Sequence, residues 1–320
     1  FIHVTPTLMF VEGDVQGTTN TPVTFEANSE VQLNIPLSSG YTWVSFPLAS
    51  NQLQHSNFLM ADMNNQDDDV IRSISAYDQY NAVYGWMGNI SSSAEKFQNS
   101  QAYKMKKSIA ETLVFKGSRI NPDSANAEIS ITPGWNWIGY VSTKNTDVNT
   151  ALANYNAVTG DIIKSQYKFA YYDNLTGWVG SLTTMYPGYG YMLKSTTTST
   201  FHYPLSTYFG RLSAEASSTI DTDVYYSFEP ASYERTMSVI AKSNICDDIA
   251  EDPAVALGAF DNTNTLRGYA KAMFNEYANE YQYFLTLYSN VENEALALRF
   301  FNIENGETII SDVTLAFATE

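Results

Sequence analysis

Four short segments occur twice in this chain, in the same order and at spacings of 87 to 94 residues. The first copies span residues 40–43 (GYTW), 69–73 (DVIRS), 85–88 (GWMG) and 103–108 (YKMKKS). The second copies span residues 134–137 (GWNW), 161–165 (DIIKS), 177–180 (GWVG) and 191–195 (YMLKS). A repeat of this length predicts two homologous copies of one folding unit, and we place the units at residues 1–111 and 112–204.

The repeated units have the sequence pattern of β-structure. Apolar and polar residues alternate over residues 31–35 and 127–131, which is the period-2 pattern of half-buried strands. Aromatic residues, which suit pleated sheets, make up 14% of the chain, and charged residues make up only 16%. These patterns predict an all-β fold with two homologous β-rich modules.

The repeat ends at Pro204, and residues 205–320 are predicted to form a different domain. Seven short strand-like segments follow one another in this region with turn residues between them: 223–228, 237–241, 254–260, 266–270, 281–288, 295–301 and 313–317. Asn305-Gly306 is a strong hairpin signal within this series. We therefore expect a β-sandwich of immunoglobulin-like or jelly-roll type to follow the two modules.

The chain is acidic, with a net charge of −17 and a pI near 4.4. Such a charge repels nucleic acid and anionic membranes. The predicted sandwich has 18 acidic and 6 basic residues, a net charge of −12, whereas residues 1–204 have 16 acidic and 11 basic residues, a net charge of −5. The sandwich is therefore expected to present the more acidic surface, which either recruits calcium or is simply solvated.

Cysteine usage and hydropathy bear on the compartment. Cys246 is the only cysteine, so an internal disulfide is excluded, and the chain fits a cytosolic protein or an exported bacterial protein stabilised by its cores. No run of 18 apolar residues is present, so no transmembrane helix is predicted. Residues 1–4 lack a basic start and a signal-like apolar stretch, and a chain that opens on Phe1 in a strand-like segment looks like a piece of a longer protein.

The second unit carries a family resemblance. The segments concerned are 133–140 (PGWNWIGY), 160–166 (GDIIKSQ), 177–182 (GWVGSL) and 187–195 (PGYGYMLKS). They resemble a Gly-Trp-rich tandem repeat of large secreted surface proteins of Bacteroidota. The first unit is a degenerate copy, with Ser45 where the second has Gly139.

The last third resembles a β-sandwich that often follows such repeats in the same family. The segments that carry this resemblance are 237–239, 257–260, 266–270 and 283–286. In that family the sandwich precedes a sorting domain for type IX secretion, so the resemblance implies export by that machinery. Asp123-Ser124-Ala125 also resembles the short acceptor motif for O-glycosylation in Bacteroidota, which makes Ser124 a candidate glycosylation site.

The five tryptophans are candidates for a binding platform, because aromatic rings stack on the faces of sugars. Four of them recur at matching repeat positions, as the pairs Trp43/Trp137 and Trp86/Trp178. A residue that each unit needs for its own packing recurs in this way, so a core role is favoured over a ligand platform for these four.

Trp135 differs from the other tryptophans, because its repeat counterpart is Tyr41. It alternates with Trp137 along one strand, and we expect the two rings to point to opposite faces of the sheet. Contact surfaces are enriched in Tyr and Trp and depleted in charge. We therefore expect any partner to meet the repeat pair, with Trp135 and Tyr41 as the exposed ligand-binding anchors and the sandwich as a spacer.

Two loops of the predicted sandwich concentrate carboxylates. Asp247, Asp248 and Asp252 lie in one loop, and Asp261 lies in the next. Calcium takes about six to eight oxygen ligands, so these four residues are the candidate calcium ligands. Neither an EF-hand spacing nor a repeated Asp motif is present, so a solvated loop is favoured over a calcium site, and no other cofactor is expected.

No catalytic grouping is recognised in the sequence. His3, His55 and His202 are far apart, and none stands beside a cysteine or a spaced carboxylate, so neither a zinc signature nor a Ser-His-Asp set is present. The carboxylate pairs of glycosidases are defined by distance in space, so the sequence leaves them open. On balance we expect no enzyme activity.

These observations favour a non-catalytic segment of an exported cell-surface protein that serves adhesion or display through protein or glycan contacts. The alternative is a carbohydrate-binding appendage of a secreted enzyme. Both hypotheses place the chain outside the cell, with extracellular glycans or proteins as partners and without nucleic-acid binding or membrane insertion.

Overall fold

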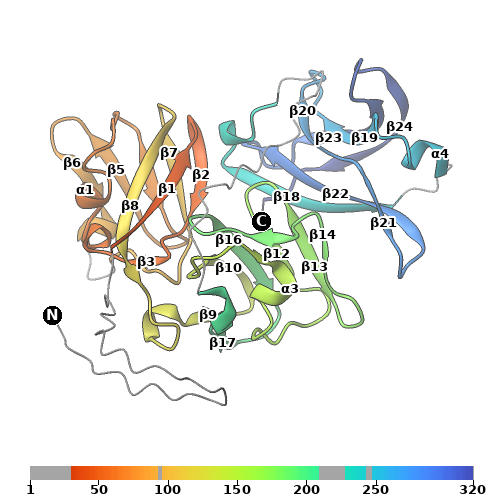
Figure 1. Ribbon diagram of the computed structural model, residues 1–320. Coiled ribbons are helices and arrows are strands. Elements are labelled where there is room, and N and C mark those ends of the chain that lie inside the picture. Colours follow the sequence, from red (N-terminus) through yellow and green to blue (C-terminus); the bar gives the residue numbers. More distant parts are fainter. Residues whose placement is uncertain (1–29, 93–95, 209–227, 243–246, 320) are drawn as a thin grey trace, which may run out of the picture.

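The computed structural model describes residues 30–92, 96–208, 228–242 and 247–319, and the fold is all-β, as predicted (Figure 1). Each α-helix in these ranges spans only four residues. The predicted strand 223–228 lies outside these ranges except for Phe228, as do His3 and Cys246.

The first module contains a five-stranded antiparallel sheet in the order β2-β7-β4-β5-β6. Its strands are β2 (Gly40–Val44), β4 (Val70–Arg72), β5 (Tyr77–Asn81), β6 (Gly85–Gly88) and β7 (Tyr103–Lys107). A three-stranded sheet in the order β1-β8-β3 consists of β1 (Val31–Leu37), β3 (Leu48–Ala49) and β8 (Glu111–Arg119). The short helices of this module are η1 (Asn51–Gln54), α1 (Ser56–Leu59) and α2 (Asn89–Ser92).

The core of the first module forms between these two sheets. Leu33 and Ile35 of β1 pack in one cluster with Ile71 and Met105 of the five-stranded sheet, because alternate residues of each strand point inward. Leu113 and Phe115 of β8 belong to the same cluster. This core therefore extends past residue 111, where the repeat places the end of the first unit.

The second module contains a five-stranded antiparallel sheet in the order β10-β16-β12-β13-β14. Its strands are β10 (Gly134–Gly139), β12 (Ile162–Lys164), β13 (Phe169–Asp173), β14 (Gly177–Gly180) and β16 (Gly190–Ser195). Two small sheets pair β9 (Ile129–Ile131) with β17 (Ser199–Phe201) and β11 (Thr146–Asp147) with β15 (Thr184–Met185). The short helices are η2 (Ala125–Ala127), α3 (Val148–Ala151) and η3 (Leu205–Thr207).

The two five-stranded sheets share one topology. When the repeated segments are matched, β2 corresponds to β10, β7 to β16, β4 to β12, β5 to β13 and β6 to β14, and the strand order is then identical. The side chains of Trp86 and Trp178 are only 2% and 6% exposed. Their backbone N–H groups donate to Oδ1 of Asn57 and of Asn149, at 2.9 and 2.7 Å. The prediction that these two tryptophans occupy equivalent, buried positions is confirmed.

The two modules contact each other through equivalent segments. Val44 forms a β-bridge with Tyr189, and Ile138, the repeat counterpart of Val44, forms a β-bridge with Gln101, the counterpart of Tyr189. Each module therefore offers the same two segments to the other. This is the pattern of a two-fold, isologous contact, here formed within one chain.

The position where the repeat motif diverges, Ser45 against Gly139, lies at this contact. The Ser45 hydroxyl donates to the carbonyl oxygen of Tyr189 at 2.6 Å. At Gly139 an added Cβ would lie 2.1 Å from the carbonyl oxygen of Asn99, so this side of the contact accepts only glycine. The two modules therefore differ at this position because one half of the contact has room for the Ser45 side chain and the other half, at Gly139, has none.

The last part of the chain is a β-sandwich of two sheets, in the orders β18-β22-β21 and β20-β19-β23-β24. Its strands are β18 (Arg235–Lys242), β19 (Val255–Phe260), β20 (Leu266–Ala270), β21 (Ala272–Asn275), β22 (Glu280–Ser289), β23 (Ala295–Asn302) and β24 (Thr308–Ala316). The helices are η4 (Pro230–Ser232) and α4 (Asp247–Ala250). Leu257 of one sheet and Leu285 of the other lie in one buried cluster between the two layers.

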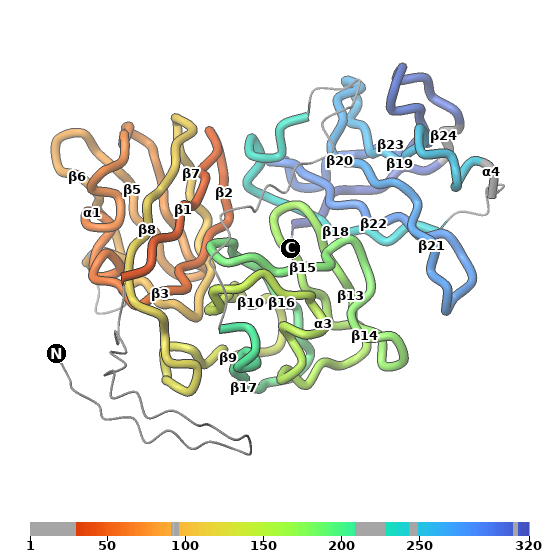
Figure 2. Tube along the Cα trace, viewed as in Figure 1, coloured from red at the N-terminus to blue at the C-terminus, as the bar shows by residue number. Residues whose placement is uncertain are grey.

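The sandwich packs against the outer faces of the two five-stranded sheets, with β18 and β22 beside the second module (Figures 1 and 2). The ring of Phe284 on β22 lies 5.6 Å from that of Phe169 and 6.2 Å from that of Tyr171, measured between centroids. The Lys164 ammonium donates to the Thr236 hydroxyl at 2.7 Å. The sandwich is therefore joined to the modules by buried contacts.

Candidate functional site

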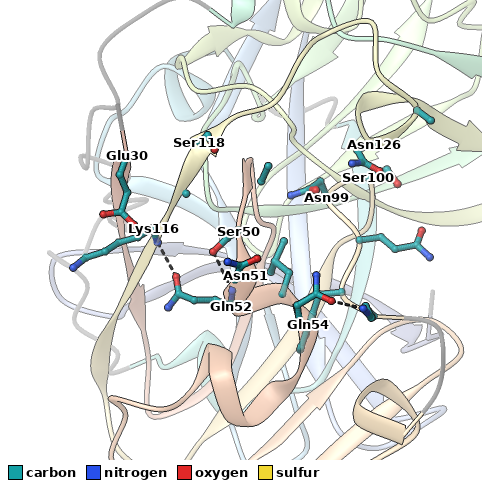
Figure 3. Close-up of a pocket in the computed structure, with 17 residues that line it drawn as sticks. Glu30, Ser50, Asn51, Gln52, Gln54, Asn99, Ser100, Lys116, Ser118 and Asn126 are labelled. Atoms are coloured by element: carbon teal, nitrogen blue, oxygen red, sulfur yellow. Dashed lines mark hydrogen bonds between the residues drawn. The ribbon is translucent and has the colours of Figure 1, made fainter. Parts of the chain in front are cut away.

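A polar groove of about 870 Å³ lies beside η1 and β8 of the first module and reaches η2 of the second (Figure 3). Amide and hydroxyl side chains dominate its lining: Ser50, Asn51, Gln52, Gln54, Gln98, Asn99, Ser100, Ser118 and Asn126. Three charged residues, Glu30, Lys96 and Lys116, also line it. Its volume is within the range of ligand-binding pockets.

Side-chain hydrogen bonds fix the wall that η1 forms. The Ser50 hydroxyl caps η1 by accepting from the backbone N–H of Gln52 at 3.1 Å. Oε1 of Gln52 accepts from the backbone N–H of Lys116 at 2.8 Å (Figure 3). The Nε2 group of Gln52 donates to the carbonyl oxygen of Val114 at 3.3 Å. Gln52 therefore attaches η1 to strand β8.

The wall formed by residues 96–100 is anchored from beneath. Phe97 is only 5% exposed and packs on Phe46 and Tyr103 in the first core. The buried Asn99 amide donates to the carbonyl oxygen of Leu48 at 2.8 Å. Burial of Phe97 holds this segment in place and leaves polar side chains at the groove surface.

The chemistry of the lining suits binding of a hydroxylated ligand. An amide side chain offers both donors and an acceptor, as a sugar hydroxyl does. Within the described part of the chain, the exposed side chains of Asn51 and Asn126 have no hydrogen-bond partner, so both are available to a ligand. Glu30 is the one carboxylate among the described lining residues, whereas glycoside hydrolysis ordinarily needs two.

Tyr41 and Trp135, the predicted anchors, lie on the outer faces of the five-stranded sheets and are half-buried. The Tyr41 hydroxyl lies 3.3 Å from Oε2 of Glu234, which belongs to the sandwich. Burial raises the pKa of Tyr41, and the negative charge of Glu234 adds to this effect. The structure thus brings Tyr41 to the junction with the sandwich, and a ligand-binding role for Tyr41 and Trp135 stays a prediction.

The prediction that Trp135 and Trp137 point to opposite faces is wrong. Residues two apart on a strand share a face. The lysine contacts agree, because Lys104 Nζ lies 4.9 Å from the ring centroid of Trp137 and 4.8 Å from that of Trp43. Lys164 Nζ lies 4.9 Å from the centroid of Trp135 and 5.7 Å from that of Trp43. Lys194 Nζ lies 5.8 Å from the centroid of Trp135, so three indoles and three ammonium groups form one cation–π cluster.

This cation–π cluster is a joint between the three units. Trp43 is 3% exposed, yet it lies on the outer face of its sheet and outside the first module's core. The Lys104 ammonium donates to the carbonyl oxygen of Glu234 at 2.8 Å. Burial lowers the pKa of Lys104 to about 8, and burial together with the Lys104 charge lowers the pKa of Lys164 well below its ordinary value.

The candidate calcium ligands are only partly described. The side chains of Asp247 and Asp248 lie outside the described residues. Asp252 accepts a backbone hydrogen bond at 2.8 Å, and Asp261 forms an ion pair with Arg267 at 2.9 Å. Among the residues that the structure describes, no group of three or more His, Cys, Asp or Glu could hold a metal ion. Calcium binding stays a prediction.

Ser124, the candidate glycosylation site, lies in the turn before η2, next to the groove. Its hydroxyl donates to the carbonyl oxygen of Asn121 at 2.7 Å, and the residue is half-buried. Glycosylation of Ser124 stays a prediction.

The groove residues were missed in the sequence because no motif marks them. The available signal was the pair of amide-rich stretches at residues 51–54 (NQLQ) and 98–101 (QNSQ), which the fold brings to the two walls of one groove.

Comparison with known proteins found no matching family model, no matching curated protein and no matching solved structure. In the part of the chain that the structure describes, no helix is both long enough and apolar enough to cross a membrane.

Proposed function

We propose that this chain is a non-catalytic segment of an exported cell-surface protein and that it contributes to adhesion by binding glycans in the polar groove. The observation that carries the proposal is the lining, in which amides and hydroxyls surround a space of about 870 Å³. Asn51 on one wall and Asn126 on the other present amides that make no hydrogen bond to the described part of the protein. Such groups bind a ligand without breaking an existing contact.

Two further observations support the proposal. A single carboxylate, Glu30, among the described lining residues suits binding better than acid–base hydrolysis. The groove also carries Lys96 and Lys116, so it is not acidic although the chain has a net charge of −17. It therefore suits glycans that bear carboxylate or sulfate groups as well as neutral ones. The resemblance of the repeat to those of secreted surface proteins of Bacteroidota supports the location.

The proposal is tested with the full chain on an array of immobilised neutral, sialylated and sulfated glycans. The double variant Asn51→Ala/Asn126→Ala should weaken binding roughly tenfold, because it removes two hydrogen-bonding groups. Asn262→Ala is the control, since this exposed amide on the sandwich is far from the groove in sequence and has no hydrogen-bond partner among the described residues. The proposal fails if no glycan is bound, or if the double variant binds as the wild type does.

A further inference from the structure

A second pocket, of about 540 Å³, lies on the outer face of the first module's five-stranded sheet, beside β5 and β6. Its lining combines two tyrosines and a thioether with two carboxylates and two amides: Tyr77, Tyr80, Met87, Asp67, Asp68, Gln79 and Asn81. This pocket shares no residue with the polar groove.

The equivalent face of the second module shows what this kind of surface holds. The strand register matches Tyr77 with Phe169 and Gln79 with Tyr171. In the second module the ring of Phe284 from the sandwich covers Phe169 and Tyr171, with centroid distances of 5.6 and 6.2 Å. In the second module this sheet face therefore holds an aromatic ring.

In the first module the part of this face that carries Tyr77 and Met87 is uncovered. The side chains of Tyr77 and Met87 are 54% and 47% exposed. An exposed aromatic ring and an exposed thioether in one pocket offer a ligand an apolar contact surface. Tyr77 stands where the second module has Phe169. Both modules therefore carry an aromatic ring at this position, and the first module adds a hydroxyl group.

The backbone at Asp68 gives an independent observation. Asp68 has a φ of 72°, and its repeat counterpart, Gly160, has a φ of 95°. This left-handed conformation is easy for glycine and costly for other residues, so the first module keeps a carboxylate where glycine would be more stable. Gln79 Nε2 donates to Oδ1 of Asp68 at 2.8 Å, which fixes the carboxylate beside the pocket.

Asp67 is fixed in a similar way, because its Oδ1 accepts from the backbone N–H of Ala82 at 2.7 Å. The second oxygen of Asp67 and that of Asp68 have no protein partner among the described residues. Both are therefore available to accept hydrogen bonds from a ligand.

We propose that this pocket binds neutral oligosaccharides, with a sugar ring stacked on Tyr77 and sugar hydroxyls donating to Asp67 and Asp68. Hydrogen bonds to an ionised acceptor are stronger than those between neutral groups. The same carboxylates repel glycans that carry carboxylate or sulfate groups. The inference rests on the proposed function, because it gives the adhesive segment a second glycan site, and ligand charge separates this site from the groove.

The test uses the full chain with ¹³C-labelled methionine methyl groups, observed by NMR. Neutral hexasaccharides of glucose, mannose or xylose are titrated in, followed by a sialylated and a sulfated oligosaccharide. The Met87 resonance, assigned with Met87→Leu, should shift in a saturable way with at least one neutral sugar and stay unmoved by the charged ones. No methionine lines the groove, so binding there leaves this signal unchanged.

Variants locate the effect. Asp68→Gly introduces the residue of the second module, so it should preserve or raise stability while weakening sugar binding roughly tenfold or more. Tyr77→Ala should weaken binding as well. Asp62→Asn is the control, since it removes an exposed negative charge of the same module outside the pocket and should leave binding unchanged.

The inference is overturned if no neutral oligosaccharide shifts Met87, if the charged oligosaccharides shift it as strongly as the neutral ones, or if Asp68→Gly binds as tightly as the wild type. The proposed function would still stand in that case if the wild type binds glycans on the array and Asn51→Ala/Asn126→Ala does not. Conversely, a Met87 shift without any effect of the groove variant would reject the groove and support the second pocket.

Discussion

Replacing Trp178 by alanine is expected to lower the free energy of unfolding by about 3–5 kcal/mol, the usual range for a large-to-small change in a core. The indole is only 6% exposed, and its ring lies 5.3 Å from that of Tyr172 and 6.4 Å from that of Tyr155, between centroids. The hydrogen bond from Trp178 to Asn149 uses the backbone N–H, so the substitution leaves it intact. The loss therefore measures packing of the ring alone.

The repeat provides a matched second variant. Trp86→Ala removes an indole that is 2% exposed and lies 5.6 Å from the ring of Tyr80, so it should cost a similar amount in the first module. Urea unfolding followed by circular dichroism, with wild type and both variants side by side, measures the two losses. A loss below about 1 kcal/mol in either variant, together with loss of glycan binding, would refute the core role and restore the platform hypothesis.

Two other substitutions test buried contacts by urea and thermal unfolding. Lys107→Met should cost about 3–5 kcal/mol at neutral pH, because it leaves the Asp69 carboxylate buried without the ammonium that lies 2.6 Å away. Burial acts to raise the pKa of Asp69, but hydrogen bonds from Lys107 and from backbone amides hold that pKa below its ordinary value of 3.8. The stabilisation is therefore present above pH 3.8 and is lost as the pH falls through the lower pKa of the folded state. A stability difference between variant and wild type that does not shrink on acidification would contradict this account. Gly139→Ser should cost about 1–3 kcal/mol, because its Cβ would meet the carbonyl oxygen of Asn99 at 2.1 Å. The reverse change, Ser45→Gly, should cost about 1 kcal/mol for one lost hydrogen bond, and a larger loss for Ser45→Gly than for Gly139→Ser would contradict the described contact.

The sequence predicted the features that each unit needs for its own packing. Trp86 and Trp178 recur because each fills its own module's core, and strand patterns such as residues 31–35 recur because alternate side chains point into that core. These requirements are local and are repeated in the sequence, so they can be found without coordinates.

Contacts between units left no such signal. The Tyr41 hydroxyl meets Glu234 across 193 residues, and Phe284 covers Phe169 from a different domain. No periodicity encodes such a contact, so Tyr41 and Trp135 were expected to be exposed although both are half-buried. The groove was missed for the same reason, because its walls come from segments that only the fold brings together.

Hydrogen–deuterium exchange of the full chain, with and without the best-bound glycan of the array, tests the groove assignment most directly. Slower exchange is expected in residues 50–54, 96–100, 116–118 and 125–126, because these segments form the walls of the groove. Slower exchange confined to the sandwich strands β19 to β24, with the groove segments unchanged, would contradict the account.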